Sequence, residues 1–269
     1  MQTVILCGGM GTRIRDVSED VPKPMIPIGD RPILWHIMKY YAHFGHTDFV
    51  LCLGYKSWTI KQYFLDYYRA SADLKVNLAN PNSPVVLSHE PREDWAITLA
   101  ETGLPTMTGG RIKKISRYIT GSDFMVTYGD GVADVDVPRL LEFHRSHGRI
   151  GTMTAVTSPG RFGEIEIDDS RITEFSEKPP VTRGRINGGF FVFRREFLDR
   201  LSNDPSLILE RGPLAELAAD GELMAYKHDG FWQCMDNSRD YHALNGMWAE
   251  GQAPWKVWDG AARPRIAAA

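Results

Sequence analysis

The chain has 269 residues, of which 43% are hydrophobic and 24% charged, and its formal net charge at pH 7 is −3. These values are typical of a globular protein, and the missing basic excess argues against a protein that coats nucleic acid. No apolar run approaches the roughly 20 residues that cross a membrane. The chain has an odd number of cysteines, Cys7, Cys52 and Cys234, and their spacing matches no zinc site. This pattern predicts a reduced, cytoplasmic compartment.

Strand and helix patterns alternate in the first half of the chain. The β-branched run at 3–7 predicts a buried strand, and residues 30–45 predict a helix that Asp30 caps, with Pro32 in its first turn. That helix has an apolar stripe at helical spacing, made by Leu34, Ile37, Met38 and Tyr41. The same criteria predict further strands at 48–55, 74–79, 84–90 and 123–134, and further helices at 56–70 and 136–148.

This β-α-β-α order predicts an α/β fold with a Rossmann-like, mostly parallel central sheet and helices on both faces. Past Gly148 the pattern changes to strands at 150–158, 163–169, 171–177 and 188–196, with helices at 212–222 and 241–251. This second half predicts an antiparallel-rich elaboration that faces the substrate. We expect one domain over 1–259, divided into halves at 1–148 and 149–259, and a flexible tail at 260–269.

A glycine loop follows the first predicted strand, with the sequence GGMGTR at 8–13. In the dinucleotide fingerprint G-x-G-x-x-G a third glycine is needed, but here Gly11 is followed by Thr12, Arg13 and Ile14. The chain also lacks the Gly-Lys-Ser/Thr of a P-loop. Lys23 stands between two prolines, which restrict its backbone. Loop amides together with Arg13 and Lys23 predict a triphosphate site, and the alternative is a plain tight turn.

The loop and the segment PKPMIPIGDRPIL at 22–34 resemble the signature of the nucleotidyltransferases that make nucleoside-diphosphate sugars. The motifs TMTGGR, TYGDGVAD, GRFGEIEI, SEKP, INGGFF and GFWQCMD follow in that family's order, so the resemblance extends to about Asp259. Within the family the combination is similar to the glucose-1-phosphate cytidylyltransferases. The resemblance implies a homo-oligomer that converts CTP and glucose 1-phosphate into CDP-glucose and pyrophosphate for bacterial surface polysaccharides such as O-antigen, without nucleic-acid or membrane partners.

The implied reaction needs no general base. The second pKa of a phosphate monoester is about 6, so the sugar phosphate is already mostly dianionic at pH 7. Catalysis must instead bring two anions together and stabilise charge on the attacked phosphate, which requires positioned cations and Mg²⁺. Asp130 ends a predicted core strand, where open α/β sheets bind ligands, although Gly-Asp-Gly is also a good plain turn.

The resemblance assigns roles to individual residues. Arg13 and Lys23 are the implied catalytic cations, and Asp130 and Asp236 the implied Mg²⁺ ligands. The implied nucleotide-binding residues are Leu6, Gly8, Gly9, Met10, Gly11, Thr12, Arg13, Lys23, Thr106, Thr108, Gly109, Arg111 and Gly129. The implied sugar-phosphate-binding residues are Gly163, Glu177, Lys178, Asn187 and Gly188. Cys7, Cys234 and Asn237-Ser238 depart from the family's usual residues, which leaves the sugar less certain than the reaction.

Other functions remain open on the sequence alone. The base could be thymine or uracil instead of cytosine, or the sugar could differ. A non-catalytic nucleotide-sugar sensor with a degenerate site is a second class, and an NAD-dependent dehydrogenase a third. The four charged residues implied in catalysis and metal binding are all present, which argues against a degenerate site.

Overall fold

The computed structural model of the chain describes residues 1–11, 14, 21–70, 72–80, 84–87, 93–157, 164–168, 171–176 and 184–259, with the backbone alone described at 164–168 and 171–176. Several residues of the predicted site lie outside this set: Thr12, Arg13, Gly163, Glu177 and Lys178. The predicted flexible tail at 260–269 also lies outside it.

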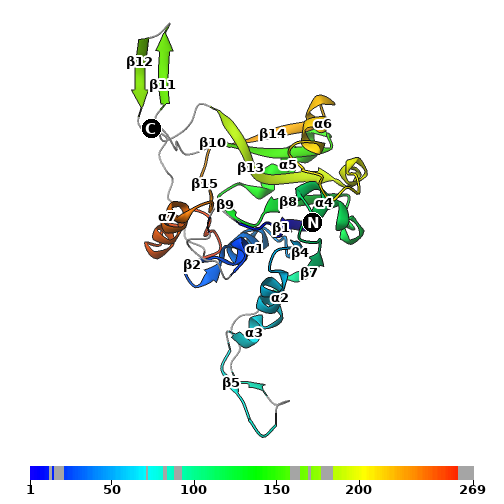
Figure 1. Ribbon diagram of the computed structural model, residues 1–269, viewed down its shortest axis with the longest axis vertical. Helices are drawn as coiled ribbons and strands as arrows, with labels where there is room; N and C mark the ends of the chain where they lie inside the picture. The colour runs from blue at the N-terminus through cyan, green and yellow to red at the C-terminus, as the bar shows by residue number, and fades with distance from the viewer. Residues whose placement is uncertain are drawn as a thin grey trace.

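The core of the fold is a seven-stranded sheet in the order β14-β10-β13-β8-β1-β4-β7 (Figure 1). Its strands are β1 (Thr3–Leu6), β4 (Asp48–Leu53), β7 (Ala96–Glu101), β8 (Asp123–Tyr128), β10 (Gly151–Thr157), β13 (Arg185–Arg194) and β14 (Leu223–His228). β1 is parallel to β4 and β8, β4 to β7, and β10 to β14, whereas β13 is antiparallel to both β8 and β10. β13 therefore runs against the other six strands, and the predicted mostly parallel α/β sheet is confirmed.

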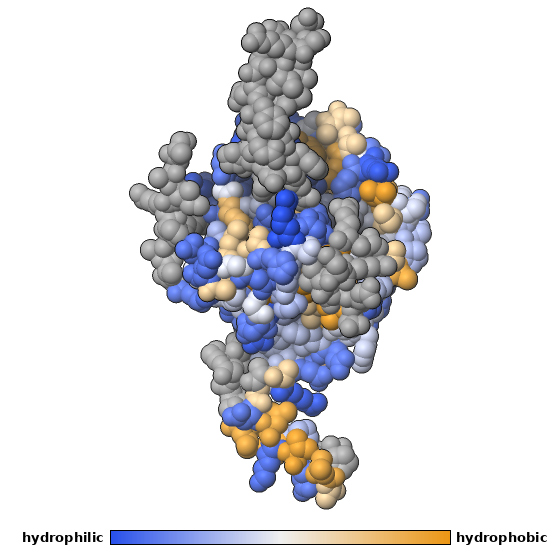
Figure 2. All heavy atoms as spheres, turned by 60° about the vertical axis from the view of Figure 1, so that its left-hand side comes forward, coloured by the Kyte–Doolittle hydropathy of each residue, from blue (hydrophilic) through white to orange (hydrophobic). Residues whose placement is uncertain are grey.

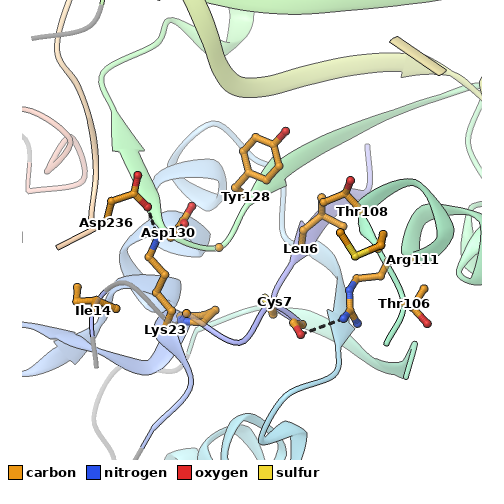
Figure 3. Close-up of a pocket in the computed structure, with 16 residues that line it drawn as sticks. Leu6, Cys7, Ile14, Lys23, Thr106, Thr108, Arg111, Tyr128, Asp130 and Asp236 are labelled. Carbon is orange, nitrogen blue, oxygen red and sulfur yellow. Dashed lines mark hydrogen bonds and ion pairs between the residues drawn. The ribbon is translucent and has the colours of Figure 1, made fainter. Parts of the chain in front are cut away.

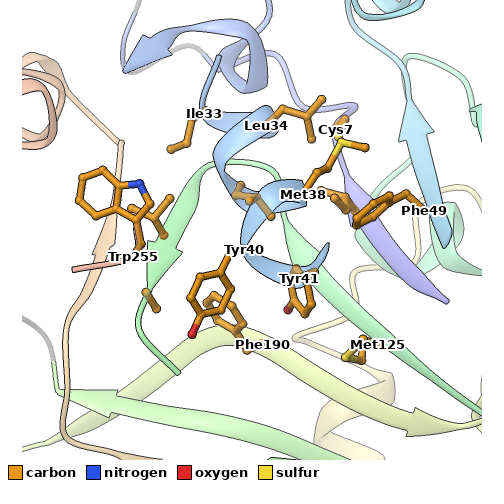
Figure 4. Close-up of a cluster of buried hydrophobic side chains, with 14 of the residues drawn as sticks. Cys7, Ile33, Leu34, Met38, Tyr40, Tyr41, Phe49, Met125, Phe190 and Trp255 are labelled. Atoms are coloured by element: carbon orange, nitrogen blue, oxygen red, sulfur yellow. The ribbon is translucent and has the colours of Figure 1, made fainter. Parts of the chain in front are cut away.

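Helices pack on both faces of this sheet, as predicted. They are α1 (Ile33–His43), α2 (Ser57–Leu65), α3 (Tyr67–Ala70), α4 (Thr108–Lys114), α5 (Val137–His147), α6 (Pro213–Ala219) and α7 (Ser238–Ala249), with short 3-10 turns η2 (Lys23–Met25), η3 (Ser116–Tyr118) and η4 (Arg195–Arg200). Successive side chains of β1 alternate between two buried clusters, because neighbouring residues of a strand point to opposite faces. Ile5 joins α1, α5 and Trp255 (Figure 4), and Val4 and Leu6 join α4 and α6.

Short two-stranded ribbons complete the fold: β2 (Pro27–Ile28) with β3 (Arg31–Pro32), β5 (Leu74–Lys75) with β6 (Val85–Val86), β9 (Gly131–Ala133) with β15 (Trp232–Cys234), and β11 (Glu164–Asp168) with β12 (Arg171–Ser176). The β5–β6 and β11–β12 ribbons project from opposite ends of the molecule (Figure 1). No helix in the described part of the chain has the length and apolar character needed to cross a membrane.

The structure corrects several local predictions. Asp30 does not cap α1, because Arg31–Pro32 pair with Pro27–Ile28 and Pro32 itself occupies the N-cap, where no side chain accepts a bond. The helix expected at 56–70 is interrupted at Asp66 into α2 and α3. The sequence patterns missed α4 and five strands, β2, β3, β7, β14 and β15. The predicted strand at 123–134 is two strands, and the bend between them carries Asp130.

Candidate active site

The candidate site lies at the point in the sheet where the order of successive strands changes direction. The chain moves from β1 outward through β4 to β7 and then returns to β8 on the other side of β1. The loops that follow β1 and β8 therefore diverge, and open α/β sheets bind ligands in such a crevice at the carboxyl ends of their strands. Here the crevice is a pocket of about 330 Å³ (Figure 3).

Most of the described residues of the predicted site line this pocket: Leu6, Gly8, Gly9, Gly11, Lys23, Thr106, Thr108, Arg111, Gly129, Asp130 and Asp236. Met10 is exposed on the loop without being part of the lining. Gly109 is buried in α4, where an added Cβ would lie 2.9 Å from Cγ of Leu207. The missing side chain of Gly109 therefore lets α4 pack closely against Leu207. Asn187 and Gly188 lie on β13, and the side-chain amide of Asn187 reaches the hydroxyl of the pocket residue Tyr128.

Lys23 is held at the centre of the charged groups. Its Nζ lies 2.5 Å from Oδ2 of Asp130 and 2.6 Å from Oδ1 of Asp236, and its side chain is 12% exposed. Burial alone would lower the pKa of Lys23, but the charges and hydrogen bonds of the two carboxylates outweigh it and raise that pKa above its ordinary value. Pro22, in an extended conformation, and the buried Pro24 fix the backbone on both sides of this lysine.

Asp130 and Asp236 meet through strand pairing, although they are far apart in the sequence. β9 pairs antiparallel with β15, so that Gly131 lies opposite Cys234. The amide of Met235 then donates to the carbonyl of Asp130 at 2.8 Å, which continues the ladder up to the two carboxylates. The sharp bend at Gly129-Asp130, after β8, turns the chain from the central sheet into this ribbon.

This pair of carboxylates is suited to a hard divalent cation. Both side chains are partly exposed, at 29% and 23%, and both already direct an oxygen at one cation, the Lys23 ammonium. Within the described ranges, no group of three or more His, Cys, Asp or Glu residues could hold a metal alone. Mg²⁺ commonly binds through one or two carboxylates together with substrate phosphates, so two carboxylates at the edge of a pocket fit that ion.

Arg111 lines the pocket and also holds the glycine loop through a hydrogen bond to Gly8. Its guanidinium is 4% exposed and donates to the carbonyls of Gly8 and Leu53, at 2.9 and 3.0 Å, and to the Thr102 hydroxyl at 2.6 Å. A Cβ on Gly8 would lie 2.1 Å from Nη1 of Arg111, so only glycine permits this approach. Burial lowers the pKa of Arg111, yet arginine stays charged, and the carbonyl dipoles stabilise that charge.

A hydrogen-bonded wall closes the side of the pocket opposite Lys23. Tyr128 donates its hydroxyl proton to Oε1 of Glu210, and Thr108 donates to Oε2 of the same carboxylate at 2.9 Å. Burial and the Glu210 charge raise the pKa of Tyr128, so this hydroxyl stays protonated at neutral pH. Asn187 donates to the Tyr128 oxygen at 3.3 Å, which connects β13 to the pocket.

Comparison with known proteins places this site in a family. Residues 2–245 match the family model described as nucleotidyl transferase. The chain belongs to the nucleotidyl transferase family. Among curated members of the family, the glucose-1-phosphate cytidylyltransferase of Salmonella typhi is 45% identical over 260 residues, which cover 96% of this chain and all of that protein. The probable glucose-1-phosphate cytidylyltransferase of Bacillus subtilis is 43% identical over 258 residues, again 96% of this chain and all of that protein.

Two solved structures share the fold at lower identity. The crystal structure of HddC from Yersinia pseudotuberculosis has a TM-score of 0.65 and 24% identity, covering 92% of this chain and 99% of that one. UDP-glucose pyrophosphorylase from Acinetobacter baumannii also has a TM-score of 0.65, with 16% identity and 96% coverage of both chains. These likenesses agree with the α/β sheet described above.

Several polar residues of the candidate site were missed in the sequence analysis. Tyr128 lies within the motif TYGDGVAD but was given no role, and Glu210 and Asp240 lie in none of the motifs. Tyr128 directly precedes Gly129-Asp130, so its position at the end of a core strand was an available signal. Glu210 and Asp240 come from segments that only the folded chain brings to the pocket.

Proposed function

We propose that this nucleotidyl transferase converts CTP and α-D-glucose 1-phosphate into CDP-glucose and pyrophosphate. The observation that carries the proposal is the 45% identity over 96% of the chain to a curated glucose-1-phosphate cytidylyltransferase. The pocket supports it, since a glycine loop, a lysine and two carboxylates converge at the crevice of the sheet.

In the proposed step, an oxygen of the sugar phosphate attacks the α-phosphorus of CTP. A new P–O bond forms while the bond from the α-phosphorus to the bridging oxygen of the β-phosphate breaks, and the bond electrons leave with pyrophosphate. No proton has to be removed from the nucleophile, because it is already a dianion. The chain contributes positioning and positive charge, which are the main requirements of phosphoryl transfer.

Specific residues carry these roles in the proposal. Asp130 and Asp236 would hold Mg²⁺, which supplies charge neutralisation at the triphosphate. Lys23 stabilises the negative charge of the two phosphates that approach each other, and the amides of Gly8–Gly11 face the triphosphate. Thr106, Thr108 and the Tyr128–Glu210 wall bound the nucleotide side. The roles predicted for Thr12, Arg13, Gly163, Glu177 and Lys178 stay predictions.

A screen of pyrophosphate release tests the assignment. The protein is incubated with each of CTP, UTP, dTTP and GTP, in combination with glucose, mannose and galactose 1-phosphates and with Mg²⁺. We expect the highest kcat/KM with CTP and glucose 1-phosphate, and no turnover when the divalent ion is removed with EDTA. A preference for dTTP or UTP would overturn the base while leaving the reaction class. Nucleotide binding without turnover for any sugar would favour the non-catalytic sensor.

We also propose that the protein is a homo-oligomer. Eight of the twelve exposed large hydrophobic side chains in the described part of the chain lie between Trp58 and Leu87, on α2, α3 and the β5–β6 ribbon. Leu78 is 94% exposed, and orange spheres cover the lower projection in Figure 2. A two-stranded ribbon is at best marginally stable in water, so its apolar surface needs a partner. A second copy offers the same patch, as a two-fold interface requires.

Charges placed on this ribbon should separate the copies. We expect Val76→Lys/Leu78→Lys to lower the mass measured by light scattering to that of a monomer, with unchanged circular dichroism. Ala215→Lys/Ala218→Lys adds the same charge to exposed positions of α6 and should keep the wild-type mass. If the ribbon variant retains the wild-type mass, or if the wild type is itself a monomer, the ribbon is not a contact between copies.

We further propose a cytoplasmic location. Cys7 and Cys52 are free thiols and both are buried, Cys7 directly after β1 and Cys52 in β4. Unpaired thiols are typical of proteins in reducing compartments, which also contain the nucleoside triphosphates that the proposed reaction consumes.

A further inference from the structure

A second carboxylate, Asp240, lies behind the candidate metal ligand Asp236. Asp240 is 4% exposed and belongs to the first turn of α7. Its Oδ2 accepts the backbone amide of Asp236 at 3.0 Å, and its Oδ1 accepts Nε2 of Gln233 at 3.0 Å. A buried carboxylate is costly unless its oxygens are hydrogen-bonded, so these contacts are required for Asp240 to be tolerated there.

The geometry differs from ordinary helix capping. In a capping box, the side chain at the third helical position accepts the amide of the N-cap residue. Here the N-cap is Asn237, whose Oδ1 accepts the Asp240 amide at 3.0 Å, but the Asp240 side chain reaches one residue further, to Asp236. The carboxylate therefore holds the backbone of the metal-ligand residue, in addition to the start of the helix.

Two backbone hydrogen bonds thereby hold Asp236. The amide of the preceding residue, Met235, donates to the carbonyl of Asp130, and the amide of Asp236 itself donates to Asp240. Gln233 adds a second tie, because its amide nitrogen also donates to the carbonyl of Cys234 at 3.0 Å. With the backbone fixed at these points, the Asp236 carboxylate is directed at the Lys23 ammonium, which Asp130 also contacts.

We propose that Asp240 and Gln233 form a positioning pair that fixes the Asp236 carboxylate for a divalent cation. The inference rests on the proposed function only in that the cation serves nucleotidyl transfer, and cation binding can be measured without turnover. Groups that orient metal ligands commonly change metal affinity or activity by about 10- to 100-fold when they are mutated. Neither residue touches substrate in this role, so they are positioning residues.

Asp240→Asn tests the pair with almost no change of shape. An asparagine has one acceptor oxygen and one donor NH₂, so it can accept from Asp236 or from Gln233, but its NH₂ then faces the other donor. We expect the dissociation constant for Mn²⁺, measured by electron paramagnetic resonance in the presence of CDP-glucose, to rise about 10-fold. The Mg²⁺ concentration for half-maximal pyrophosphate release should rise in parallel, with a smaller change in the KM for nucleotide.

Exchanging the two groups provides the decisive control. In Gln233→Glu/Asp240→Asn, the new amide can donate to the new carboxylate while its oxygen still accepts the Asp236 amide. The double variant should therefore bind Mn²⁺ more tightly than either single variant, although its new carboxylate cannot donate to the Cys234 carbonyl as Gln233 does. Gln233→Glu alone opposes two carboxylates and should weaken Mn²⁺ binding at least as much as Asp240→Asn. This double-mutant cycle isolates the pairwise interaction from the effects of each single change.

A purely structural role predicts other results. Asp136→Ala removes the cap of α5, where Asp136 accepts the Arg139 amide, and should lower the melting temperature without changing Mn²⁺ binding. If Asp240→Asn behaves like this variant, or if the exchanged pair binds Mn²⁺ no more tightly than either single variant, the positioning role is overturned. If the wild type binds Mn²⁺ but releases no pyrophosphate, the proposed function fails and the positioning role stands.

Discussion

Replacing Lys23 with alanine is expected to abolish most of the turnover while strengthening the binding of a divalent cation. Turnover should fall by about 10²- to 10³-fold, the usual cost of removing one group that stabilises charge in the transition state. The second effect follows from the ion pairs, since Lys23 is the cation that Asp130 and Asp236 share at 2.5 and 2.6 Å. Without it the two carboxylates repel each other and bind Mn²⁺ more tightly.

Two measurements separate these effects. Single-turnover release of pyrophosphate from CTP reports the chemical step, and an Mn²⁺ titration without sugar phosphate reports the carboxylates. Lys39→Ala is a matched control, because Lys39 is also a partly buried lysine paired at 2.7 Å with a carboxylate, Glu93, away from the pocket. A Lys23→Ala variant that loses turnover and Mn²⁺ binding together would show that this lysine organises the site instead of competing with the cation.

Replacing Arg111 with lysine is expected to destabilise the fold and to weaken nucleotide binding together. A lysine cannot supply the fork of donors that reaches Gly8, Leu53 and Thr102. The carbonyls of Gly8 and Leu53 keep other donors, the amides of Tyr55 and Thr102, so the cost is that of lost hydrogen bonds to a charged group. Such bonds contribute about 1.5–3 kcal/mol each, so the free energy of unfolding should fall by about 3 kcal/mol. The glycine loop then loses its support, and the KM for CTP should rise with it.

Urea denaturation and CTP titration on the same samples test this coupling. The control is Arg117→Lys, at an exposed arginine of η3 whose guanidinium lies over the Tyr118 ring. This variant should leave both the stability and the CTP affinity unchanged. Weaker CTP binding at unchanged stability would instead indicate that Arg111 contacts the nucleotide directly, which is the role that the family resemblance implied. Gly8→Ala in the otherwise wild-type chain crowds the same guanidinium, so this variant should also lower the free energy of unfolding.

Patterns of adjacent residues predicted the sheet well. The run at Thr3–Leu6 is fully buried, and so is the stripe of Leu34, Ile37, Met38 and Tyr41, because local periodicity reflects burial directly. The missed strand β7 is at the sheet edge, with only one of its six residues buried, so it lacks a strong apolar signal. The division into halves at Gly148 stays a prediction; β10, β13 and β14 join the same sheet as β1.

The site was less accessible to sequence reasoning than the sheet. Motifs identified Lys23, Asp130 and Asp236 because the identity of those residues carries the family resemblance. Sequence alone could not reveal that Arg111 is buried beneath Gly8, or that Asp240 supports Asp236, since both facts depend on packing between distant segments. The type of a residue indicates the chemistry that it can perform. The hydrogen-bond partner of a buried polar side chain, in contrast, is determined only when the chain has folded.

The pairing of β9 with β15 has a consequence for the order in which the protein is made. Asp130 emerges from the ribosome 106 residues before Asp236, the difference between their positions in the sequence. At about 5–20 residues per second, synthesis of that interval takes several seconds or longer. During that time the nascent chain can fold its first strands and the glycine loop, but it holds only one carboxylate of the pair. With the roles proposed for these two carboxylates, the nascent chain stays inactive until the segment that leads into α7 has been made.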